Sequence, residues 1–498
     1  MKYYIKTFGC QMNESDSERI ASFLESLPHP LPRRQAGNPL LIKERGLKVA
    51  KDINEADLVI FNTCGIRQMA EDRVYGQIHN IHVARNMKHE TKKPIIILTG
   101  CLANRKDVQR RLKDKVDLFC EIKDFQEEFK NLKIKNCLKI KNLKLKIPAQ
   151  QENKLCSDYL SINPKYNNSH SAFVPVMTGC NNFCSYCVVP YARGREVSRP
   201  SKEIILEIKN LIKNGCKEII LLGQNVNSYQ HAPSPQPSPD YGRGGNSNPS
   251  PPLGEMSRTR DREGDVVNFP KLLQLIEKIP GKFWISFMSS HPKDFSSELI
   301  ETIAKSKKIC EHIHLPLQAG DDKILLAMNR KYTSEKYLEL VEKIKSALIK
   351  HKPDKLYSIT TDIIVGFPGE TKKQFLESAR VMKKVRYDLV YFGQFSPRPG
   401  TVAYGMKDNV SKLEKKKREF FLNEILKETA FGNNQKYLGK NLEVLIDKKD
   451  GANYFGRTHS LKNVKLISTQ KNLVGEFVKV KITKANIWNL EAELDIKP

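Results

Sequence analysis

The chain of 498 residues contains no apolar run long enough to cross a membrane. Its first residues also lack the apolar stretch that is typical of a secretion signal. These two absences exclude membrane-spanning and secreted proteins, and we expect a cytoplasmic protein with no membrane partner. The length predicts about three domains, each large enough to bury a core of its own.

Acidic residues are the scarcer charged class, with 56 Asp and Glu against 84 Lys and Arg, so the formal net charge is +28. A positive charge this large indicates an anionic partner such as nucleic acid. The alternative is a lysine-rich genome that places Lys wherever solvent tolerates it. Composition alone leaves both interpretations open.

The chain also lacks a disulfide framework, because its 11 cysteines are an odd number scattered through a long sequence. This usage favours a reducing compartment with metal-binding or catalytic thiols. Cys180, Cys184 and Cys187 stand at C-x3-C-x2-C spacing, and no second CxxC or HxxxH pair follows nearby to complete a zinc site.

Three thiolates on one loop can hold three irons of a [4Fe–4S] cluster and leave the fourth iron without a protein ligand. An open coordination position is where a metal centre performs chemistry. The spacing therefore predicts a catalytic iron–sulfur cluster, with a zinc knuckle or buried structural cysteines as the alternatives.

A second set of cysteines comprises Cys10, Cys64 and Cys101, each at a predicted strand-to-helix turn beside a glycine or a small polar residue. In a parallel sheet such turns meet at one end, so the three thiols can converge on one site. Ordinary burial is the alternative, because cysteine is among the most frequently buried residue types.

The pattern of strands and helices predicts an α/β protein with three domains. Residues 1–150, with an insertion at 28–46, alternate strands and helices and predict a parallel α/β domain. Residues 166–405 repeat this alternation six times and predict a partial parallel barrel, interrupted by a disordered Pro-, Gly- and Ser-rich insertion at 230–264. Residues 436–498 predict a small all-β barrel of a type that binds nucleic acid.

The strands expected in these regions are short apolar runs. They lie at 58–61, 95–98, 172–176, 218–222, 284–287, 312–315, 361–365, 389–392, 442–446, 464–467 and 477–482, and a charged helix is expected over 411–429.

Several motifs together resemble the methylthiotransferases, a family of radical S-adenosylmethionine (SAM) enzymes. They are T-F-G-C-Q-M-N at 7–13, N-T-C at 62–64, G-C at 100–101, the C-x3-C-x2-C loop with V-V-P-Y-A-R-G-R-E-V-S-R-P at 188–200, and S-H-P at 290–292. The resemblance covers nearly the whole chain apart from the two insertions. It implies an N-terminal methylthiotransferase domain, a radical SAM partial (βα) barrel and a C-terminal TRAM domain that binds RNA.

The same resemblance implies the cofactors, which are two [4Fe–4S] clusters, one on each cysteine triad, and S-adenosyl-L-methionine. Tyr186 corresponds to an aromatic residue near the SAM adenine, although plain packing is an equal alternative. Gly223 and Gln224 end a barrel strand where the superfamily meets the SAM amine. Arg195 and Arg193 are expected at substrate phosphate or the cofactor carboxylate, with a solvated loop as the alternative. No catalytic residue is assigned beyond the cluster ligands.

For the RNA, G-R-T at 456–458 is similar to the TRAM signature, which makes Arg457 a candidate contact. The chain departs from the family pattern at Gln68, where relatives more often carry an acid, and at Ala319, where they carry serine. Neither departure removes a cluster ligand.

The implied activity acts on tRNA carrying N6-isopentenyladenosine next to the anticodon, at position 37. It converts this nucleoside to its 2-methylthio derivative by C–H activation at C2, sulfur insertion and methylation. A single-electron donor such as flavodoxin or ferredoxin is implied as a partner, and a monomer suffices. The alternatives are a methylthiotransferase for threonylcarbamoyladenosine tRNA or for a ribosomal-protein aspartate, and a non-catalytic iron–sulfur RNA-binding protein.

Overall fold

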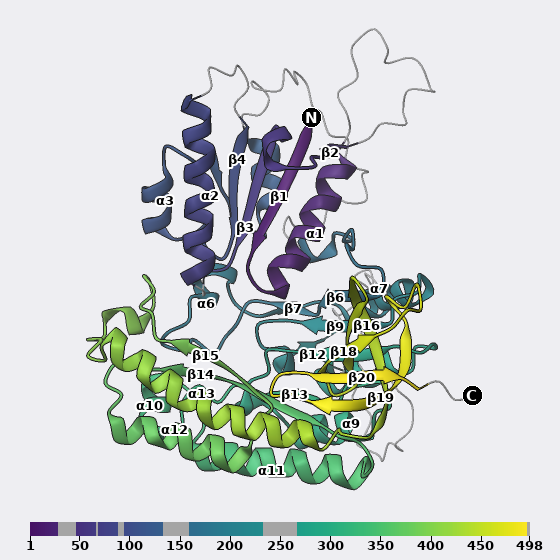
Figure 1. The fold of residues 1–498 in the computed structure, drawn as a ribbon. Helices are drawn as coiled ribbons and strands as arrows, with labels where there is room; N and C mark the ends of the chain where they lie inside the picture. The colour runs from purple at the N-terminus through teal and green to yellow at the C-terminus, as the bar shows by residue number, and fades with distance from the viewer. Residues whose placement is uncertain (28–45, 66–67, 88–93, 133–158, 233–265, 496–498) are drawn as a thin grey trace, which may run out of the picture.

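The computed structural model describes residues 1–27, 46–65, 68–87, 94–132, 159–232 and 266–495. The predicted insertions at 28–46 and 230–264 lie almost entirely outside these described residues, so the expected disorder of 230–264 stays a prediction. Figure 1 shows three units: a purple and blue sheet with helices, a larger teal-to-green unit beneath it, and a small yellow barrel beside the second unit.

The first unit is a five-stranded parallel sheet of order β2-β1-β3-β4-β5. Its elements are β1 (Lys2–Phe8), α1 (Gln11–Ser26), β2 (Lys48–Val49), η2 (Ile53–Glu55), β3 (Leu58–Thr63), α2 (Gln68–Met87), β4 (Ile95–Gly100), α3 (Lys106–Leu112), β5 (Leu118–Phe119) and α4 (Phe125–Asn131).

Both faces of this sheet are covered by helices. Leu58 and Ile60 of β3 pack with residues of α1 and α4, whereas Val59 and Phe61 pack with residues of α2 and α3. Successive side chains of a strand point to opposite faces, and a sheet buried on both sides needs apolar residues at every position. This is why β3 and β4 are continuous apolar runs in the sequence.

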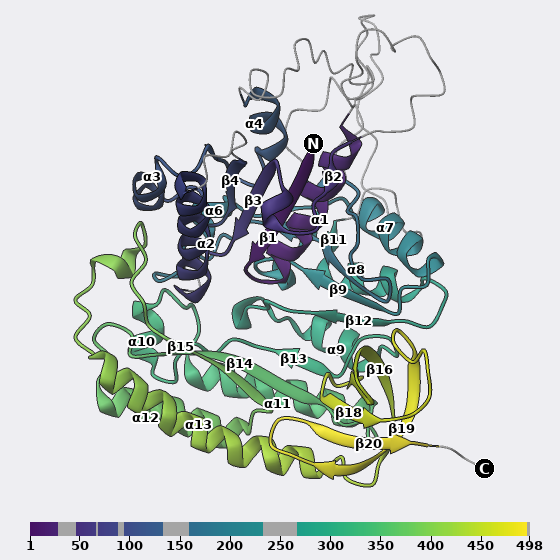
Figure 2. The ribbon, with the colours of Figure 1, turned by 45° about the horizontal axis from the view of Figure 1, so that its top comes forward.

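The second unit is built from two three-stranded parallel sheets, β6–β9–β12 and β13–β14–β15. A parallel bridge between Ile285 and Ile309 joins them, and the six strands form the predicted partial barrel. Helices cover its outer side (Figure 2) and share one hydrophobic core with the strands.

The elements of this unit follow one another in alternation. They are η4 (Tyr159–Ser161), β6 (Ser171–Pro175), β7 (Met177–Thr178), α6 (Val189–Arg193), β8 (Val197–Ser198), α7 (Ser201–Lys213), β9 (Glu218–Leu222), η5 (Val226–Ser228), β10 (Gln230–His231), β11 (Val267–Asn268), α8 (Phe269–Glu277), β12 (Trp284–Phe287), η6 (Pro292–Asp294), α9 (Ser297–Lys305), β13 (His312–His314), α10 (Asp322–Ala327), α11 (Ser334–His351), β14 (Ser358–Val365), α12 (Lys372–Val385), β15 (Leu389–Gln394) and η7 (Val402–Gly405).

The insertion within this unit leaves from a paired strand. β10 pairs antiparallel with β11, with Gln230 opposite Asn268 and His231 opposite Val267. Gln230 and His231, which the sequence analysis assigned to the insertion, therefore belong to the folded unit.

The third unit is a closed barrel of order β16-β17-β18-β20-β19, which confirms the predicted small all-β barrel. Its strands are β16 (Asn441–Asp450), β17 (Asn453–Thr458), β18 (Asn463–Ile467), β19 (Phe477–Ala485) and β20 (Leu490–Leu494), and α13 (Lys412–Gln435) leads into it. β17 and β20 were not predicted, and α13 continues past the expected end at Thr429. No helix of the described ranges has the length and hydropathy to span a membrane.

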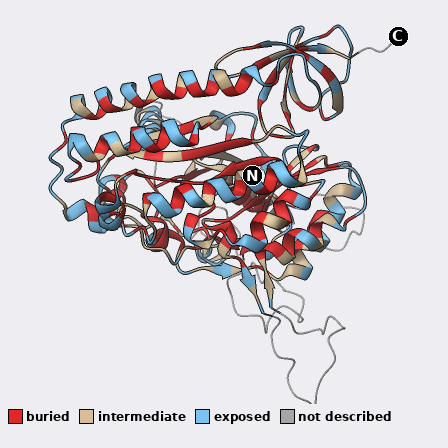
Figure 3. Cartoon of the chain, turned by 90° about the horizontal axis from the view of Figure 1, so that it is seen from below, coloured by how far each residue is buried: buried red, intermediate tan, exposed pale blue. Residues whose placement is uncertain are grey.

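The closed barrel docks on the amino-terminal ends of β9 and β12. The ring of Trp284 lies 4.8 Å from that of Phe477 and 5.0 Å from that of His459. Arg457 of β17 donates to Glu218 of β9 at 2.8 Å. In Figure 3 the residues coloured as buried gather between the units and along the inner faces of the helices.

Arg457 is placed in this interface, where it also donates to Asp447 at 2.8 Å. Burial opposes its charge, but Asp447 and Glu218 outweigh this effect and raise its pKa. The Glu218 side chain is 0% exposed and needs a cationic partner. Arg457 is therefore a docking residue, and its contact with RNA stays a prediction.

We expect Arg457→Gln to weaken this docking, because it leaves the buried Glu218 carboxylate unpaired, at a cost of about 3–5 kcal/mol. Thermal unfolding followed by circular dichroism should show an apparent Tm lower by about 5 °C or more. The control is Lys481→Gln, which removes the same charge from an exposed position of β19 and should leave the Tm within about 1 °C. Equal effects of the two variants would contradict the docking role.

Candidate metal centre

Cys10, Cys64 and Cys101 lie at matching ends of three neighbouring strands. Phe8 of β1 is aligned with Thr63 of β3, and Thr63 with Gly100 of β4. Each cysteine follows its strand end by one or two residues, so all three lie at the carboxyl edge of the sheet, where ligands bind in parallel α/β folds.

Two asparagines connect the loops that carry these cysteines. The side chain of Asn62, next to the Cys64 loop, donates to the backbone carbonyl of Asn13 at 2.8 Å. It also accepts a hydrogen bond of 2.9 Å from the side-chain amide of Asn13. The Asn13 side chain in turn accepts from the backbone N–H of Cys10 at 3.3 Å. Both asparagines are fully buried. Their amides lie within the recognised motifs, but the sequence analysis gave them no role.

Gly100 is required for the close approach of these loops. Its φ is +85°, and a Cβ there would lie 2.5 Å from Oδ1 of Asn62 and 2.6 Å from the carbonyl oxygen of Thr63. Glycine is therefore the residue that allows Cys101 to follow β4 in this direction.

Cys180, Cys184 and Cys187 occupy the loop between β7 and α6, after the first barrel strand. Backbone hydrogen bonds hold this loop. The Cys180 N–H donates to the carbonyl of Gly194, and the Cys187 N–H donates to the carbonyl of Cys184. Ser185 is tied to the end of α10 through a 3.1 Å hydrogen bond to the carbonyl of Met328.

Each triad has a polar donor at a sulfur. Arg330 donates to Sγ of Cys184 at 3.6 Å, and Asn182 to Sγ of Cys180 at 3.6 Å. At the first triad, the donor comes from the second unit: Nε of Arg193 lies 3.2 Å from Sγ of Cys101. Such donors stabilise negative charge on sulfur, the form that ligates a metal.

The two triads offer only thiolate sulfur, which is the ligand that iron–sulfur clusters take from a protein. All six cysteines are free thiols. The donor set therefore fits iron–sulfur clusters.

Binding of such clusters must displace protons. Burial raises the pKa of Cys187 to about 12, and the charge of Cys184 adds to this shift. Burial also raises the pKa of Cys10, although Arg193 acts in the opposite direction. These thiols are protonated at neutral pH, and cluster assembly releases their protons.

The two triads lie near one another. Arg193 follows Cys187 by six residues, and its Nε lies 3.2 Å from Sγ of Cys101, so the segment of the second triad reaches the first triad across the interface between the units. The carboxyl edge of the first sheet and the cysteine loop of the partial barrel therefore face a common region.

Arg193 differs from its expected role. Instead of pointing to phosphate or a cofactor carboxylate, it is buried and forms a 2.6 Å ion pair with Asp16 of α1. Asp16 and Cys101 raise its pKa against the opposing effect of burial. A basic loop residue is usually solvated, and only the docking of the two units reveals the carboxylate that faces it.

A second ion pair joins the two units near Cys64. Arg398, in the loop after β15, donates to Glu71 of α2 at 3.1 Å and to the side-chain oxygen of Gln68 at 2.8 Å. Glu71 also accepts from Arg105 at 2.7 Å. Gln68, which departs from the family pattern, thus acts as a neutral acceptor beside the carboxylate of Glu71.

Tyr186, Gly223 and Gln224, which were predicted to bind SAM, each have different neighbours. Tyr186 packs on a buried cluster that includes Met328 and Phe367. A Cβ on Gly223 would lie 2.6 Å from the Met177 side chain, which accounts for the glycine by packing. The side-chain oxygen of Gln224 is buried and has no hydrogen-bond partner among the described residues, as expected of an acceptor kept for a ligand.

Arg195 lies over the ring of Phe183, 4.5 Å from its centroid. Phe183 lies between Cys180 and Cys184 and has a positive φ of 47°. The cation–π contact with Arg195 therefore holds the cysteine loop at this residue. The roles of Tyr186, Gly223, Gln224 and Arg195 toward SAM stay predictions.

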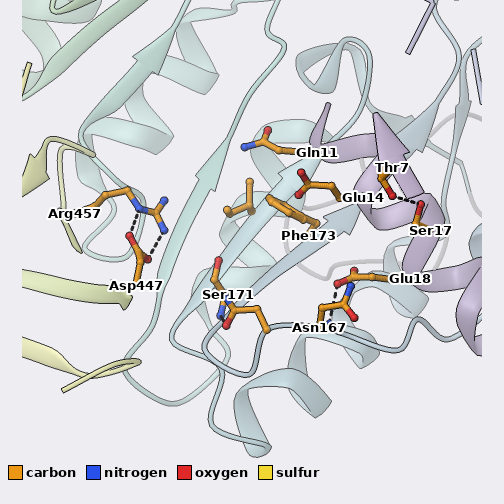
Figure 4. Close-up of a pocket in the computed structure, with 12 residues that line it drawn as sticks. Thr7, Gln11, Glu14, Ser17, Glu18, Asn167, Ser171, Phe173, Asp447 and Arg457 are labelled. Atoms are coloured by element: carbon orange, nitrogen blue, oxygen red, sulfur yellow. Dashed lines mark hydrogen bonds and ion pairs between the residues drawn. The ribbon is translucent and has the colours of Figure 1, made fainter. Parts of the chain in front are cut away.

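A cavity of about 470 Å³, lined by polar residues together with Phe173 and Ile220, lies where the three units meet. Figure 4 shows Gln11 and Glu14 of the first unit opposite Arg457 and Asp447 of the third. None of the six cysteines lines this cavity. It is distinct from the metal centre, although Gln11 directly follows Cys10.

Known proteins are similar to this chain in all three units. Three family models match: the Radical SAM superfamily over residues 174–382, Uncharacterized protein family UPF0004 over 39–121, and the TRAM domain over 435–494. A tRNA-2-methylthio-N(6)-dimethylallyladenosine synthase of Thermoanaerobacter pseudethanolicus is 37% identical over 99% of this chain and 92% of the relative. The chain belongs to this synthase family.

Proteins with the same name from Clostridium botulinum and Clostridium tetani are 38% and 36% identical to the chain. Each alignment covers 99% of this chain and 96% of the relative. The resemblance to methylthiotransferases is thereby confirmed, and the synthase family accounts for all three units described above.

We expect Gly100→Ala to disturb the first cysteine triad, because its Cβ would push against Asn62 and Thr63. After anaerobic reconstitution, iron should fall from about eight to about four atoms per chain. Iron analysis with electron paramagnetic resonance (EPR) checks this loss. The control is Gly76→Ala in α2, where a Cβ meets nothing within 4 Å. Full iron content in Gly100→Ala would contradict the requirement for glycine.

Proposed function

We propose that this chain converts N6-isopentenyladenosine at position 37 of tRNA to its 2-methylthio derivative. The observation that carries the proposal is the pair of cysteine triads, which two different units bring to one interface. One triad suits SAM activation, and a second is needed if the enzyme itself must also deliver sulfur. Membership of the synthase family supports the same reaction.

In this proposal Cys180, Cys184 and Cys187 hold one [4Fe–4S] cluster, and Cys10, Cys64 and Cys101 hold the other. When bound, the clusters and S-adenosyl-L-methionine supply the electron, the radical chemistry, the sulfur and the methyl group. The protein's part is to hold the two triads at a fixed separation.

The chain's own residues do this through buried contacts. The Arg193–Asp16 and Arg398–Glu71 ion pairs hold the two units together on either side of the first triad. The hydrogen bonds at Cys180, Ser185 and Cys187 keep the second triad in place. Gln224 offers an unused acceptor at the end of β9 for the cofactor amine.

The partner is tRNA, in line with the net charge of +28 and the TRAM match. For the finer details we propose a flavodoxin or ferredoxin as electron donor, a monomeric enzyme, and action in the cytoplasm. The names of the relatives do not favour the threonylcarbamoyladenosine, ribosomal-protein or non-catalytic alternatives.

The test is anaerobic reconstitution followed by incubation with SAM, a reductant and isopentenylated tRNA, with nucleoside mass spectrometry of the product. We expect a 2-methylthio nucleoside from the parent chain. Cleavage of SAM to 5′-deoxyadenosine without this product would overturn the substrate assignment, and the absence of both would overturn the enzyme proposal.

Cys184→Ala should abolish the product, because it removes one ligand of the cluster next to the open iron. Its affinity for tRNA should stay within about twofold of the parent, measured by filter binding, since RNA affinity comes mainly from phosphate contacts elsewhere on the surface. Cys216→Ala, which changes a buried cysteine outside both triads, is the control and should keep the activity. Modification by Cys184→Ala would contradict the assigned role.

A further inference from the structure

We propose that Arg193 is a positioning residue for the cluster of the first unit, which it serves by holding the sulfur of Cys101 and favouring the reduced cluster. The inference rests on the proposed function in one respect, that Cys101 is a cluster ligand.

The position of Arg193 in the chain is the first observation. It ends α6, six residues after Cys187, and therefore belongs to the segment that carries the second triad. Its side chain crosses the interface to reach Cys101 of the first triad. One segment of the barrel unit thus supplies ligands to one cluster and a cation to the other.

The geometry of the guanidinium is the second observation. Its three nitrogens go to three partners: Nε to Sγ of Cys101 at 3.2 Å, Nη2 to Asp16 at 2.6 Å, and Nη1 to the hydroxyl of Tyr159 at 3.4 Å. The side chains of Arg193 and Asp16 are 2% and 0% exposed. Water therefore does not compete for the contact with sulfur.

The pairing of Arg193 with Asp16 uses a single carboxylate oxygen, and another donor of the guanidinium goes to sulfur. An arginine and a carboxylate commonly form two parallel hydrogen bonds. Here only one oxygen of Asp16 accepts, and its other oxygen is buried with no partner among the described residues. The guanidinium is turned so that Nε, which could serve this oxygen, meets sulfur instead.

The consequence concerns the reduction potential of the cluster. Hydrogen bonds and positive charge at a ligand sulfur stabilise the more negative, reduced state and raise the potential. Arg193 supplies both to Cys101, while Asp16 partly cancels its charge. Removal of either residue should therefore shift the potential, and the two shifts should have opposite signs.

The experiment uses the full chain with Cys180, Cys184 and Cys187 replaced by alanine, so that only the first triad binds a cluster. After anaerobic reconstitution, the potential is measured by redox titration followed by EPR. We expect Arg193→Gln to lower the potential and Asp16→Asn to raise it. Arg193→Lys keeps the charge but loses the planar donor set, and should give an intermediate value.

Arg199→Gln is the matched control, because Arg199 is also buried, lies on the same segment and forms a 2.7 Å ion pair with Glu207 without contacting a cysteine. It should lower the apparent Tm and leave the potential unchanged. If Arg193 only docks the two units, Arg193→Gln and Asp16→Asn should shift the potential in the same direction or not at all, which would overturn the inference.

The two proposals fail in different ways. If the alanine background binds no iron, then Cys10, Cys64 and Cys101 do not form a cluster site, and both the cluster assignment and this inference are overturned. If the cluster forms but its potential is the same with and without Arg193, the proposed function stands and the inference alone is overturned. Should Arg193→Gln fail to fold, the signs of the Arg193→Lys and Asp16→Asn shifts decide.

Discussion

The ion pair between Arg193 and Asp16 is the contact on which the arrangement of the metal centre depends. Both side chains lie out of water between two units, and their separation would leave two charges unpaired in a region of low dielectric. The interface therefore has little freedom to slide or open. A second pair, Arg398 with Glu71, applies the same constraint on the side of Cys64. Two cysteine triads on separate units are thereby kept at one spacing.

The alignment of strand ends in the parallel sheet brings the three cysteines of the first triad to one edge. β1, β3 and β4 end in step, so three loops that are far apart in the sequence start from one edge. The amides of Asn13 and Asn62 and the glycine at position 100 then set how closely these loops approach. The partial barrel adds its own loop from the end of its first strand. In both the parallel sheet and the partial barrel, the cysteines therefore lie at the carboxyl ends of the strands, where parallel folds usually place their functional residues.

Much of this could be predicted from sequence, because the signals are local. Continuous apolar runs identify β3 and β4, and turns after them place Cys64 and Cys101 at one edge. β17 and β20 were missed because neither contains a continuous apolar run: N-Y-F-G-R-T buries a glycine and a threonine, and L-E-A-E-L alternates apolar residues with glutamates.

Other features depend on contacts between distant parts of the chain. Arg193 and Asp16 are 177 residues apart, and Arg457 and Glu218 are separated by 239. An arginine in a basic loop or a β-barrel is ordinarily read as a contact for an anionic ligand, and only the docking of the units shows the buried carboxylate opposite it. The unused acceptor of Gln224 likewise becomes visible only once its surroundings are known.

The short pairing of β10 with β11 has a consequence for how the chain can change over time. The two strands hold residues 230–231 beside residues 267–268, so the points at which the chain leaves and re-enters this part of the fold are fixed next to each other. A different peptide inserted between these two points would begin and end at the same places. We therefore expect this position to accept an exchanged peptide while the strand ends that carry the cysteines keep their geometry.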